Sequence, residues 1–247
     1  MVADTHPLDS PGRRLAVVIP TLNDDAALAR LLDVLAHLEL PPEHVIVVDG
    51  ASSEATAALC SRAGCSHLPC RPGRGLQLRA GIDAARAAGA EILWMVHADC
   101  EPHPLAARAV RETIAAGASG GYFNFRFGGE RSATKCVLEI CIAWRCRLSM
   151  VYGDQGIFVS RRAYDATPGI GPAPLFEEVP LVRALRRTRR FVAVPLPMLV
   201  SERRWRREGL LLRTARNRAL ALAFAAGVDA GTLERWYRAS RARQSRS

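Results

Sequence analysis

Lysine is almost absent from this sequence. Lys135 is the only one, so nearly all of the positive charge comes from arginine. The 34 lysine and arginine residues outnumber the 24 acidic residues and give a net charge of +10 at pH 7. This charge favours anionic partners, such as nucleotide phosphates, nucleic acid or anionic lipid, and composition alone does not choose among them.

Long hydrophobic runs and a secretory leader are also missing. Near the C-terminus the longest uncharged apolar stretch is residues 219–228, far short of the ~20 residues that a membrane-spanning helix needs. Residues 1–13 have no apolar core and are expected to form a disordered polar tail. The seven cysteines show neither a disulfide framework nor zinc-knuckle spacing. We therefore expect a cytoplasmic protein whose cysteines are small buried hydrophobic residues.

Hydrophobic residues make up 49% of the chain, which is enough for a sizeable folded core. In the first hundred residues, short β-branched runs alternate with helical patterns, which is typical of a parallel sheet with helices on both faces. Asn23 or Asp24 is expected to cap the first helix. The expected strands of this half are residues 14–20, 44–48, 66–69 and 92–96.

The second half of the chain has a different pattern. Residues 122–127 alternate with phenylalanine on one face, which indicates a strand and hence a sheet of mixed orientation. A strand is also expected at residues 156–160, and a later helix is expected to begin near Pro180. Between the two strands lies a helix whose apolar stripe consists of Val137, Ile140, Cys141, Trp144 and Leu148.

Residues 206–247 form a basic segment that predicts an amphipathic, helical C-terminal region. Its apolar stripe consists of Leu212, Ala215, Ala219, Leu222 and Ala226. Two interpretations stay open: the region covers the domain and exposes a solvated face, or it lies on the inner face of an anionic membrane. Nucleic acid is not expected as a partner, because the segment lacks interleaved aromatic residues and a recognition motif.

Polar residues follow three of the expected buried strands. These segments are residues 21–24 (TLND), 49–52 (DGAS) and 97–99 (HAD). Ligands of open α/β sheets bind outside the carboxyl ends of the strands, so the three segments are candidates for one shared site. The carboxylate of Asp49 suits a hydrogen bond to a ribose or a base. No GxGxxG motif follows the first strand, which argues against a dinucleotide-binding fold.

Several motifs, taken in their order along the chain, resemble glycosyltransferases of family 2. They are IPTLND, VVDGASSEAT, HAD, GDQGIFVSRR and LFEEVPLVRALRR. The resemblance covers about residues 14–205 and is nearest to a bacterial branch described only as "transferase 2". It implies a GT-A fold, an α/β architecture with a mixed, mostly parallel sheet flanked by helices. It also implies a nucleotide-binding half at residues 14–100 and an acceptor half at residues 101–205.

The resemblance further implies a role for each residue that matches a family motif. The donor would be a nucleoside-diphosphate sugar, linked to UDP or GDP. Asp99 corresponds to the last aspartate of the family's DxD motif and would bind the Mn²⁺ or Mg²⁺ that offsets charge on the departing diphosphate. His97 stands where many relatives have the first aspartate, and either metal ligation or a hydrogen bond to the nucleotide is open to it. The nucleotide-binding residues would be Pro20, Thr21, Asn23, Asp24, Asp49, Ser52, Arg74, Gln77 and His97.

Glu177 and Glu178 occupy the position of the family's Glu-Asp pair. By this alignment Glu178 is the base that takes the proton of the acceptor hydroxyl as its oxygen attacks the anomeric carbon with inversion. Pro180 is expected in the first turn of the following helix, which would place both glutamates at the positive end of the helix dipole and favour their ionised form. The contacts to the acceptor or the donor sugar would come from Asp154, Gln155, Arg204 and Trp205.

The sequence thus predicts a metal-dependent, inverting glycosyltransferase that uses a nucleoside-diphosphate sugar. The acceptor is unknown, with a lipid-linked acceptor as one option. One alternative is a nucleotidyltransferase of the same fold. Such an enzyme would be expected to have a glycine-rich phosphate loop after the first strand, and residues 20–24 are not such a loop. The other is a catalytically weak accessory protein that binds nucleotide sugar or membrane, which the departures from the family pattern at His97, Glu178 and Ser201 would favour.

Overall fold

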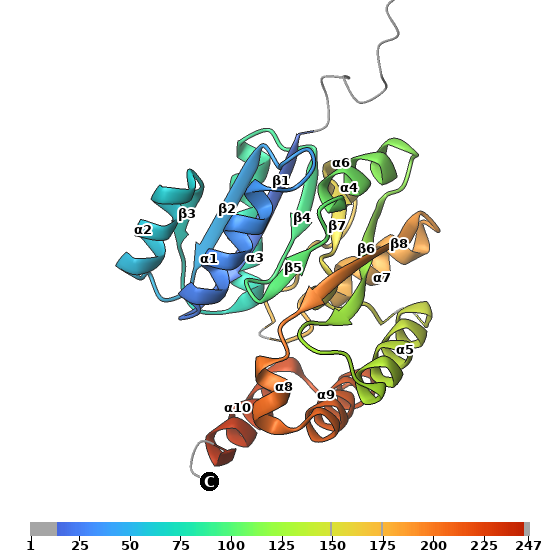
Figure 1. The fold of residues 1–247 in the computed structure, drawn as a ribbon. Helices are drawn as coiled ribbons and strands as arrows, with labels where there is room; N and C mark the ends of the chain where they lie inside the picture. The colour runs from blue at the N-terminus through green and yellow to red at the C-terminus, as the bar shows by residue number, and fades with distance from the viewer. Residues whose placement is uncertain (1–13, 149, 174, 245–247) are drawn as a thin grey trace, which may run out of the picture.

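The computed structural model describes residues 14–148, 150–173 and 175–244, so the predicted disordered tail at residues 1–13 lies outside the described residues. The described residues form one eight-stranded sheet with the strand order β3-β2-β1-β4-β7-β6-β8-β5 (Figure 1). The strands are β1 (Leu15–Thr21), β2 (His44–Asp49), β3 (Ser66–Pro69), β4 (Ile92–Met95), β5 (Cys100–Pro102), β6 (Gly120–Phe127), β7 (Phe158–Ser160) and β8 (Phe191–Val200).

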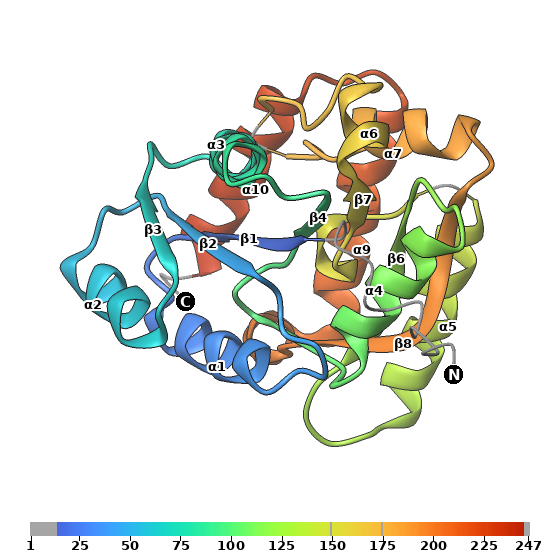
Figure 2. The same ribbon diagram turned by 90° about the horizontal axis from the view of Figure 1, so that it is seen from above.

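Helices cover both faces of this sheet, and Figure 2 shows α1 and α3 on opposite sides of β1. The α-helices are α1 (Asp25–Ala36), α2 (Glu54–Ala63), α3 (Arg74–Ala87), α4 (Ala106–Ala115), α5 (Ala133–Arg147), α6 (Arg161–Asp165), α7 (Val179–Arg187), α8 (Arg203–Glu208), α9 (Leu210–Ala225) and α10 (Ala230–Gln244). A short 3₁₀ turn, η1, spans Gly153–Gln155.

The strand directions confirm a mixed, mostly parallel sheet. Strands β3, β2, β1 and β4 run parallel to one another, as the alternating first half of the sequence predicts. Strand β7 is antiparallel to both β4 and β6, whereas β6 and β8 are parallel. Strand β5 closes the sheet, antiparallel to β8. The carboxyl ends of β1, β2 and β4 therefore point to one edge, where ligands of such sheets bind.

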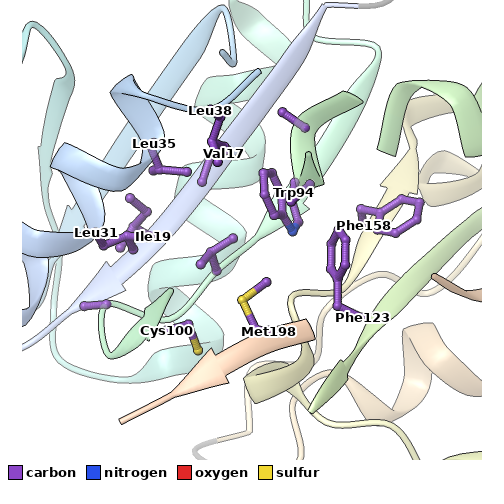
Figure 3. Packing of buried hydrophobic residues seen from close by; sticks show 14 of the residues in the cluster. Val17, Ile19, Leu31, Leu35, Leu38, Trp94, Cys100, Phe123, Phe158 and Met198 are labelled. Carbon is purple, nitrogen blue, oxygen red and sulfur yellow. The ribbon is translucent and has the colours of Figure 1, made fainter. Parts of the chain in front are cut away.

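Strand β1 is buried on both faces and divides the core in two. Leu15, Val17 and Ile19 face one cluster, which includes the inner residues of α1 (Figure 3). Ala16 and Val18 face the other, which includes the inner residues of α3 and α7. Because side chains alternate along a strand, a continuous β-branched run is what a strand covered on both sides requires.

Helix α3 approaches the sheet closely at Gly81. A Cβ atom at this position would lie 2.4 Å from Cγ1 of Val18 and 2.7 Å from Cγ2 of Val48. Contacts of this length are far inside van der Waals distance, so only glycine fits. This approach fixes the height of α3 over the ends of β1 and β2, and α3 carries two of the predicted site residues, Arg74 and Gln77.

In the second half the predicted alternation is confirmed. Phe123, Phe125 and Phe127 of β6 are buried in the same cluster as α1, while Asn124 and Arg126 between them are exposed. Helix α7 begins at Val179 with Pro180 in its first turn, also as predicted. The sequence analysis did not anticipate α4, β5 or β8, although β8 pairs with β6 over most of its length.

Two local predictions hold only in part. Asp24 is the N-cap residue of α1, as predicted, but its side chain makes no capping hydrogen bond, and its carboxylate pairs with the guanidinium of Arg203 (Nη2 to Oδ2, 2.5 Å). The cysteines are not uniformly buried either: Cys60, Cys100 and Cys146 are, but Cys141 is exposed on α5. Its position on the apolar stripe of that helix explains this, since the stripe faces outward.

The C-terminal region consists of helices that gather at the lower end of the molecule in Figure 1. Helix α9 packs on the domain, but its outer face carries the apolar stripe and Arg213 of its inner face is buried. The expected solvated polar outer face is therefore wrong for α9. No helix in the described ranges has the length and apolar character needed to cross a membrane.

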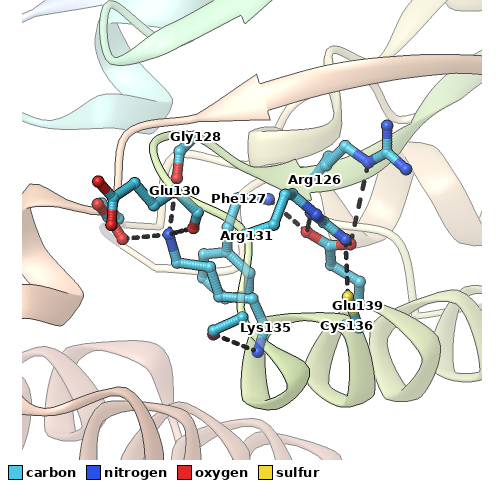
Figure 4. Close-up of polar contacts among 10 residues, drawn as sticks. Arg126, Phe127, Gly128, Glu130, Arg131, Lys135, Cys136 and Glu139 are labelled. Carbon is cyan, nitrogen blue, oxygen red and sulfur yellow. Dashed lines mark hydrogen bonds and ion pairs between the residues drawn. The ribbon is translucent and has the colours of Figure 1, made fainter.

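The single lysine anchors this C-terminal region to the sheet. The buried Nζ of Lys135, at the start of α5, donates to the carbonyl oxygens of Gly128 (3.0 Å) and Glu130 (2.5 Å). It also forms an ion pair with Glu202, the residue that precedes α8. Beside it, Glu139 accepts two hydrogen bonds from Arg131 and one from the backbone N–H of Phe127 (Figure 4). The loop before α5 is thereby fixed beneath β8.

Candidate active site

The predicted polar strand ends do meet at one edge of the sheet. Thr21 and Asp49 are register partners at the ends of β1 and β2, and the backbone N–H of Gly50 donates to the carbonyl of Thr21 (2.9 Å). The Nε2 amide of Gln77 donates to the carbonyls of both Thr21 (2.7 Å) and Val48 (2.8 Å). Gln77 is buried, so it braces the two strand ends against α3, and its predicted contact with ribose or diphosphate stays a prediction.

Asp49 shapes the turn after β2. Its two carboxylate oxygens accept hydrogen bonds from the backbone N–H groups of Ala51 (2.8 Å) and Ser53 (2.7 Å), and His67 lies 3.5 Å away. Burial opposes ionisation, but these donors outweigh it and lower the pKa of Asp49. The side chain is fully buried, so a role in contacting the base would come through the turn that it holds.

The other residues predicted to bind the nucleotide lie near Gln77 and Asp49. Asn23 and Ser52 are exposed and have the left-handed backbone (φ 51° and 55°), which asparagine tolerates and serine rarely adopts. The buried Oγ1 of Thr21 makes no hydrogen bond to any described residue. Pro20 is half-buried beside it, and Asp24 is engaged by Arg203. These residues all lie at or just after the carboxyl ends of β1 and β2.

His97 and Asp99 follow β4 and reach toward the second half of the chain. The ring of His97 packs on Gly153, where a Cβ atom would lie 2.7 Å from Nε2. The carbonyl of Asp99 accepts a hydrogen bond from the backbone N–H of Ser201 (2.9 Å). Hence the HAD and GDQ motifs, more than fifty residues apart in the sequence, lie side by side.

Asp154 is the third acidic residue beside this strand end. Burial raises the pKa of its carboxyl, and the nearby Asp99 adds to the effect, whereas Arg145 and Arg74 oppose it. The buried Oδ1 of Asp154 accepts no hydrogen bond from any described residue. By contrast, Gln155 is buried with its amide bonded to Phe123 and Arg145, and it does not line the cavity described below. Its predicted contact with the sugar stays a prediction.

Glu178 lies at the start of α7 and is buried. Its Oε1 accepts the backbone N–H of Gly153 (3.0 Å), and its buried Oε2 has no hydrogen-bond partner within the described part of the chain. Burial and the charge of Glu177 raise the pKa of Glu178 to about 8, against the opposing effect of Arg74. For Glu178 this direction is opposite to the predicted preference for the ionised form, because the helix N-terminus does not offset the loss of water and the neighbouring carboxylate.

Glu177 pairs with Arg74 and joins the two halves of the domain. The guanidinium Nε and Nη2 of Arg74 donate to Oε1 and Oε2 of Glu177, the second at 3.0 Å. This contact depends on Gly75, where a Cβ atom would lie 2.4 Å from the carbonyl oxygen of Gly171. The sequence analysis missed Gly75, and a glycine in the first turn of a helix was the only available signal.

A cavity of about 220 Å³ collects the predicted residues of both halves. Six of them line it, from five segments of the chain: Arg74, His97, Asp99, Asp154, Glu178 and Trp205. The C-terminal helices supply residues of the opposite wall that the sequence analysis did not identify, namely Arg213, Thr214, Asn217, Arg218 and Tyr237. Phe176, which has a left-handed backbone (φ 60°) just before the glutamate pair, stacks on Phe224 of α9 with 4.6 Å between ring centroids.

The predicted acceptor residues of α8 behave differently from one another. Trp205 lines the cavity but is mostly buried, packed edge-on against Phe127 (5.3 Å between centroids) and beneath the guanidinium of Arg213 (4.8 Å). Its predicted stacking on an acceptor ring stays a prediction. The side chain of Arg204 lies outside the described residues. Arg203, which was not predicted, ties α8 to Asp24 at the start of α1.

The motifs that converge on this cavity match a known family. The family model for glycosyl transferase family 2 matches residues 16–156, more than half of the chain. The chain belongs to this family. No curated protein matches this family 2 glycosyltransferase by sequence.

Solved structures similar to this family 2 glycosyltransferase include glucosyl-3-phosphoglycerate synthase from Mycobacterium tuberculosis. Its complex with Mn²⁺, UDP and phosphoglyceric acid has a TM-score of 0.59 and 21% identity, covering 88% of this chain and 80% of that chain. Its complex with Mg²⁺ and UDP has a TM-score of 0.56 and 22% identity, covering 75% and 70%. At such identities the likeness shows the fold, and the fold is GT-A, as the sequence motifs imply.

Proposed function

We propose that this family 2 glycosyltransferase transfers a sugar from a nucleoside-diphosphate sugar to an acceptor hydroxyl with inversion, and that it depends on a divalent cation. One observation carries the proposal: predicted site residues from five separate segments of the chain line a single cavity beyond the carboxyl end of β4. Chance folding of polar strand ends would not bring Arg74 and Glu178, from opposite halves of the domain, to the same wall.

Glu178 is the proposed general base. Its Oε2 has no hydrogen-bond partner among the described residues, while Oε1 is held by the N–H of Gly153, so the carboxylate is fixed with one oxygen left for a proton. The acceptor oxygen attacks the anomeric carbon, its proton passes to Oε2, and the bond to the diphosphate breaks on the opposite face. A base with a pKa of about 8 binds that proton more strongly than an ordinary carboxylate.

Asp99 and Asp154 fit a divalent cation. Both line the cavity, and the buried Oδ1 of Asp154 accepts no hydrogen bond from any described residue, so this oxygen would be available as a ligand of the cation. In the described ranges, no group of three or more histidine, cysteine or acidic side chains could hold a metal ion. Mg²⁺ is often bound by one or two carboxylates together with waters and substrate phosphates. When bound, the cation would offset negative charge on the departing diphosphate.

Arg74 positions the reacting groups. It holds Glu177 in a two-point ion pair, lines the cavity and lowers the pKa of Glu178 by its charge. A planar guanidinium with one edge bound to Glu177 still has N–H donors for a diphosphate oxygen. The base of the donor would lie at the edge formed by Pro20, Thr21, Asn23, Asp24 and Ser52, with His97 between base and cation.

The similar synthase structures contain UDP, which makes UDP the first donor nucleotide to test. Calorimetric titration of the protein with UDP and with GDP, each with and without Mn²⁺, tests the donor and the cation together. We expect one nucleotide to bind, and to bind more weakly after Asp99→Asn. Absence of binding by either nucleotide in the presence of Mn²⁺ would remove the enzyme proposal.

A screen of nucleotide sugars, read by the mass of the products, would then identify the sugar. Binding of a nucleotide sugar without transfer to any acceptor tested would instead favour the alternative of an accessory protein that binds nucleotide sugar. The structure favours the enzyme in one respect. An accessory protein would gain nothing from burying a carboxylate oxygen without a hydrogen bond, which costs about 1–3 kcal/mol or more.

A further inference from the structure

Two helices beside the cavity expose their large apolar side chains to solvent. On α5 these are Val137 (58% exposed), Ile140 (58%), Trp144 (59%) and Leu148 (70%). On α9 they are Leu211 (67%), Leu212 (62%) and Leu222 (66%). A soluble domain normally turns such a stripe toward its core, and a large exposed apolar patch marks an interaction surface. We refer to these seven residues as the apolar rim.

The apolar rim borders the mouth of the cavity. Cys141 of α5 and Arg218 of α9 are both exposed and both line the cavity, so the mouth opens between these helices. Positions 137, 141, 144 and 148 share one face of a helix, as do positions 211, 215, 218 and 222. Each apolar stripe therefore continues the wall of the cavity outward, and Figure 1 shows the two helices side by side at the lower end of the molecule.

The charge on the two helices that carry the apolar rim is almost all positive. Helix α9 contains no acidic residue, and the only one in α5, Glu139, is mostly covered and bound by Arg131. The exposed charges on the two helices include Arg147, whose guanidinium lies over the ring of Trp144 (5.4 Å), and Arg218 at the mouth. An apolar stripe flanked by arginine is the pattern of a helix that lies in the interface of an anionic membrane.

We propose that the apolar rim docks on an anionic phospholipid bilayer, with the mouth of the cavity facing the lipid. A second copy of the chain fits this surface less well, because pairing two rims would bring arginines of the same sign together. Docking does not depend on the chemistry proposed above. If that chemistry holds, the orientation gives a lipid-borne acceptor hydroxyl a direct route to Glu178.

Co-sedimentation with vesicles tests the docking without any assay of transfer. The full chain is mixed with vesicles of phosphatidylcholine alone, or of phosphatidylcholine with phosphatidylglycerol. We expect binding to the second kind and little to the first. The double variant Trp144→Glu, Leu222→Glu should bind at least about tenfold more weakly, because it puts charge where apolar area would enter the interface. Arg147→Gln should weaken binding about fivefold and reduce its dependence on salt.

Leu105→Glu is the matched control, because Leu105 is also exposed (39%) but lies at the start of α4, outside the apolar rim. It should bind vesicles like the unchanged protein, and thermal melting should show that all variants are folded. Equal binding by the double variant, or no binding to anionic vesicles at low salt, overturns the proposal. So does a dimer, seen by analytical ultracentrifugation, that the double variant dissociates, since the rim would then be an interface between copies.

Discussion

Replacing Glu178 by glutamine tests both the assignment of the base and the electrostatics of its burial. The substitution keeps the size and shape of the side chain and removes its charge. In the folded protein the pKa of Glu178 is about 8, compared with an ordinary value of 4.5, because the carboxyl is buried next to Glu177 and Arg74 offsets only part of the effect. Glutamine cannot titrate, so every effect of this shift should vanish in the variant.

The sign of the effect on stability follows from proton binding. Between pH 4.5 and pH 8 the folded protein keeps a proton on Glu178 that the unfolded chain has released. The free energy of unfolding therefore falls as the pH rises, by about 1.4 kcal/mol for each pH unit in this window. Below the window both states are protonated and above it neither is, so the slope from Glu178 disappears. The glutamine variant should become more stable than the unchanged protein as the pH rises through this range.

Urea unfolding followed by tryptophan fluorescence measures this difference, since Trp94 is fully buried in the core. Both proteins are unfolded at several pH values within the window, and their unfolding free energies are subtracted, so that contributions of groups they share cancel. In the same buffers, kcat/KM of the unchanged enzyme should rise about tenfold per pH unit up to about pH 8. The variant should lose transfer by about 10² to 10⁴ while keeping its affinity for the donor nucleotide.

Two results would refute this reasoning. A stability difference that does not change with pH would mean that the Glu178 carboxyl is ionised at neutral pH and that the burial argument fails. Unchanged transfer by the variant would mean that another group takes the proton. The two outcomes are separate, because the first concerns the pKa and the second concerns the role.

Three further substitutions test the packing around the site. Gly81→Ala places a methyl group so close to Val18 and Val48 that the steric cost should lie toward the upper end of about 1–3 kcal/mol. After the ~1 kcal/mol gained in helix propensity, the protein should lose about 1–2 kcal/mol of stability, and an unchanged urea midpoint would contradict this. Lys135→Met should lower the free energy of unfolding by about 3 kcal/mol, the lower end of the usual ~3–5 kcal/mol, because it leaves the partly covered carboxylate of Glu202 without its cation. An unchanged free energy of unfolding in the same assay would mean that water already solvates this ion pair. Phe224→Ala removes the ring on which Phe176 stacks, just before Glu178 in the chain. Because Glu178 would then be misplaced, kcat should fall about ten- to a hundredfold with little change in the KM of the donor. A rise in KM of about ten- to a hundredfold with unchanged kcat would instead show a binding defect.

The order of strands and helices in the first half could be predicted because local pattern determines it. A β-branched run in β1 fits only a strand covered on both faces, and the meeting of Thr21 with Asp49 follows from the parallel sheet. The roles of individual side chains could be predicted from the sequence less well. Asp49 and Gln77 match the family pattern, yet both are bonded within the protein, and which carbonyl a buried amide meets depends on the height of α3 over the strands.

Long-range pairs and the direction of helix faces lay beyond the sequence for the same reason. Arg74 and Glu177 are 103 positions apart, and Asp24 and Arg203 are 179 apart. A pattern of closely spaced residues therefore cannot predict either contact. Periodicity found the stripe on α5 correctly but could not say whether it faces core or solvent. That choice is made by the buried Lys135 and Leu138 on the other side of the helix, which occupy the core position.

Hydrogen bonding divides the residues of the family pattern into two groups with different work to do. Asp49, Gln77 and Gln155 are buried with their polar atoms bonded, so they hold strand ends and turns in fixed positions. Asp154 and Glu178 each keep a buried oxygen that no described residue bonds, in the wall of one cavity. Unbonded buried oxygens cost stability, and a rigid frame is what allows a protein to sustain that cost at a site of chemistry. A shared motif identifies both groups alike, and the contacts of each atom separate the residues that support the fold from those that we propose to act on a substrate.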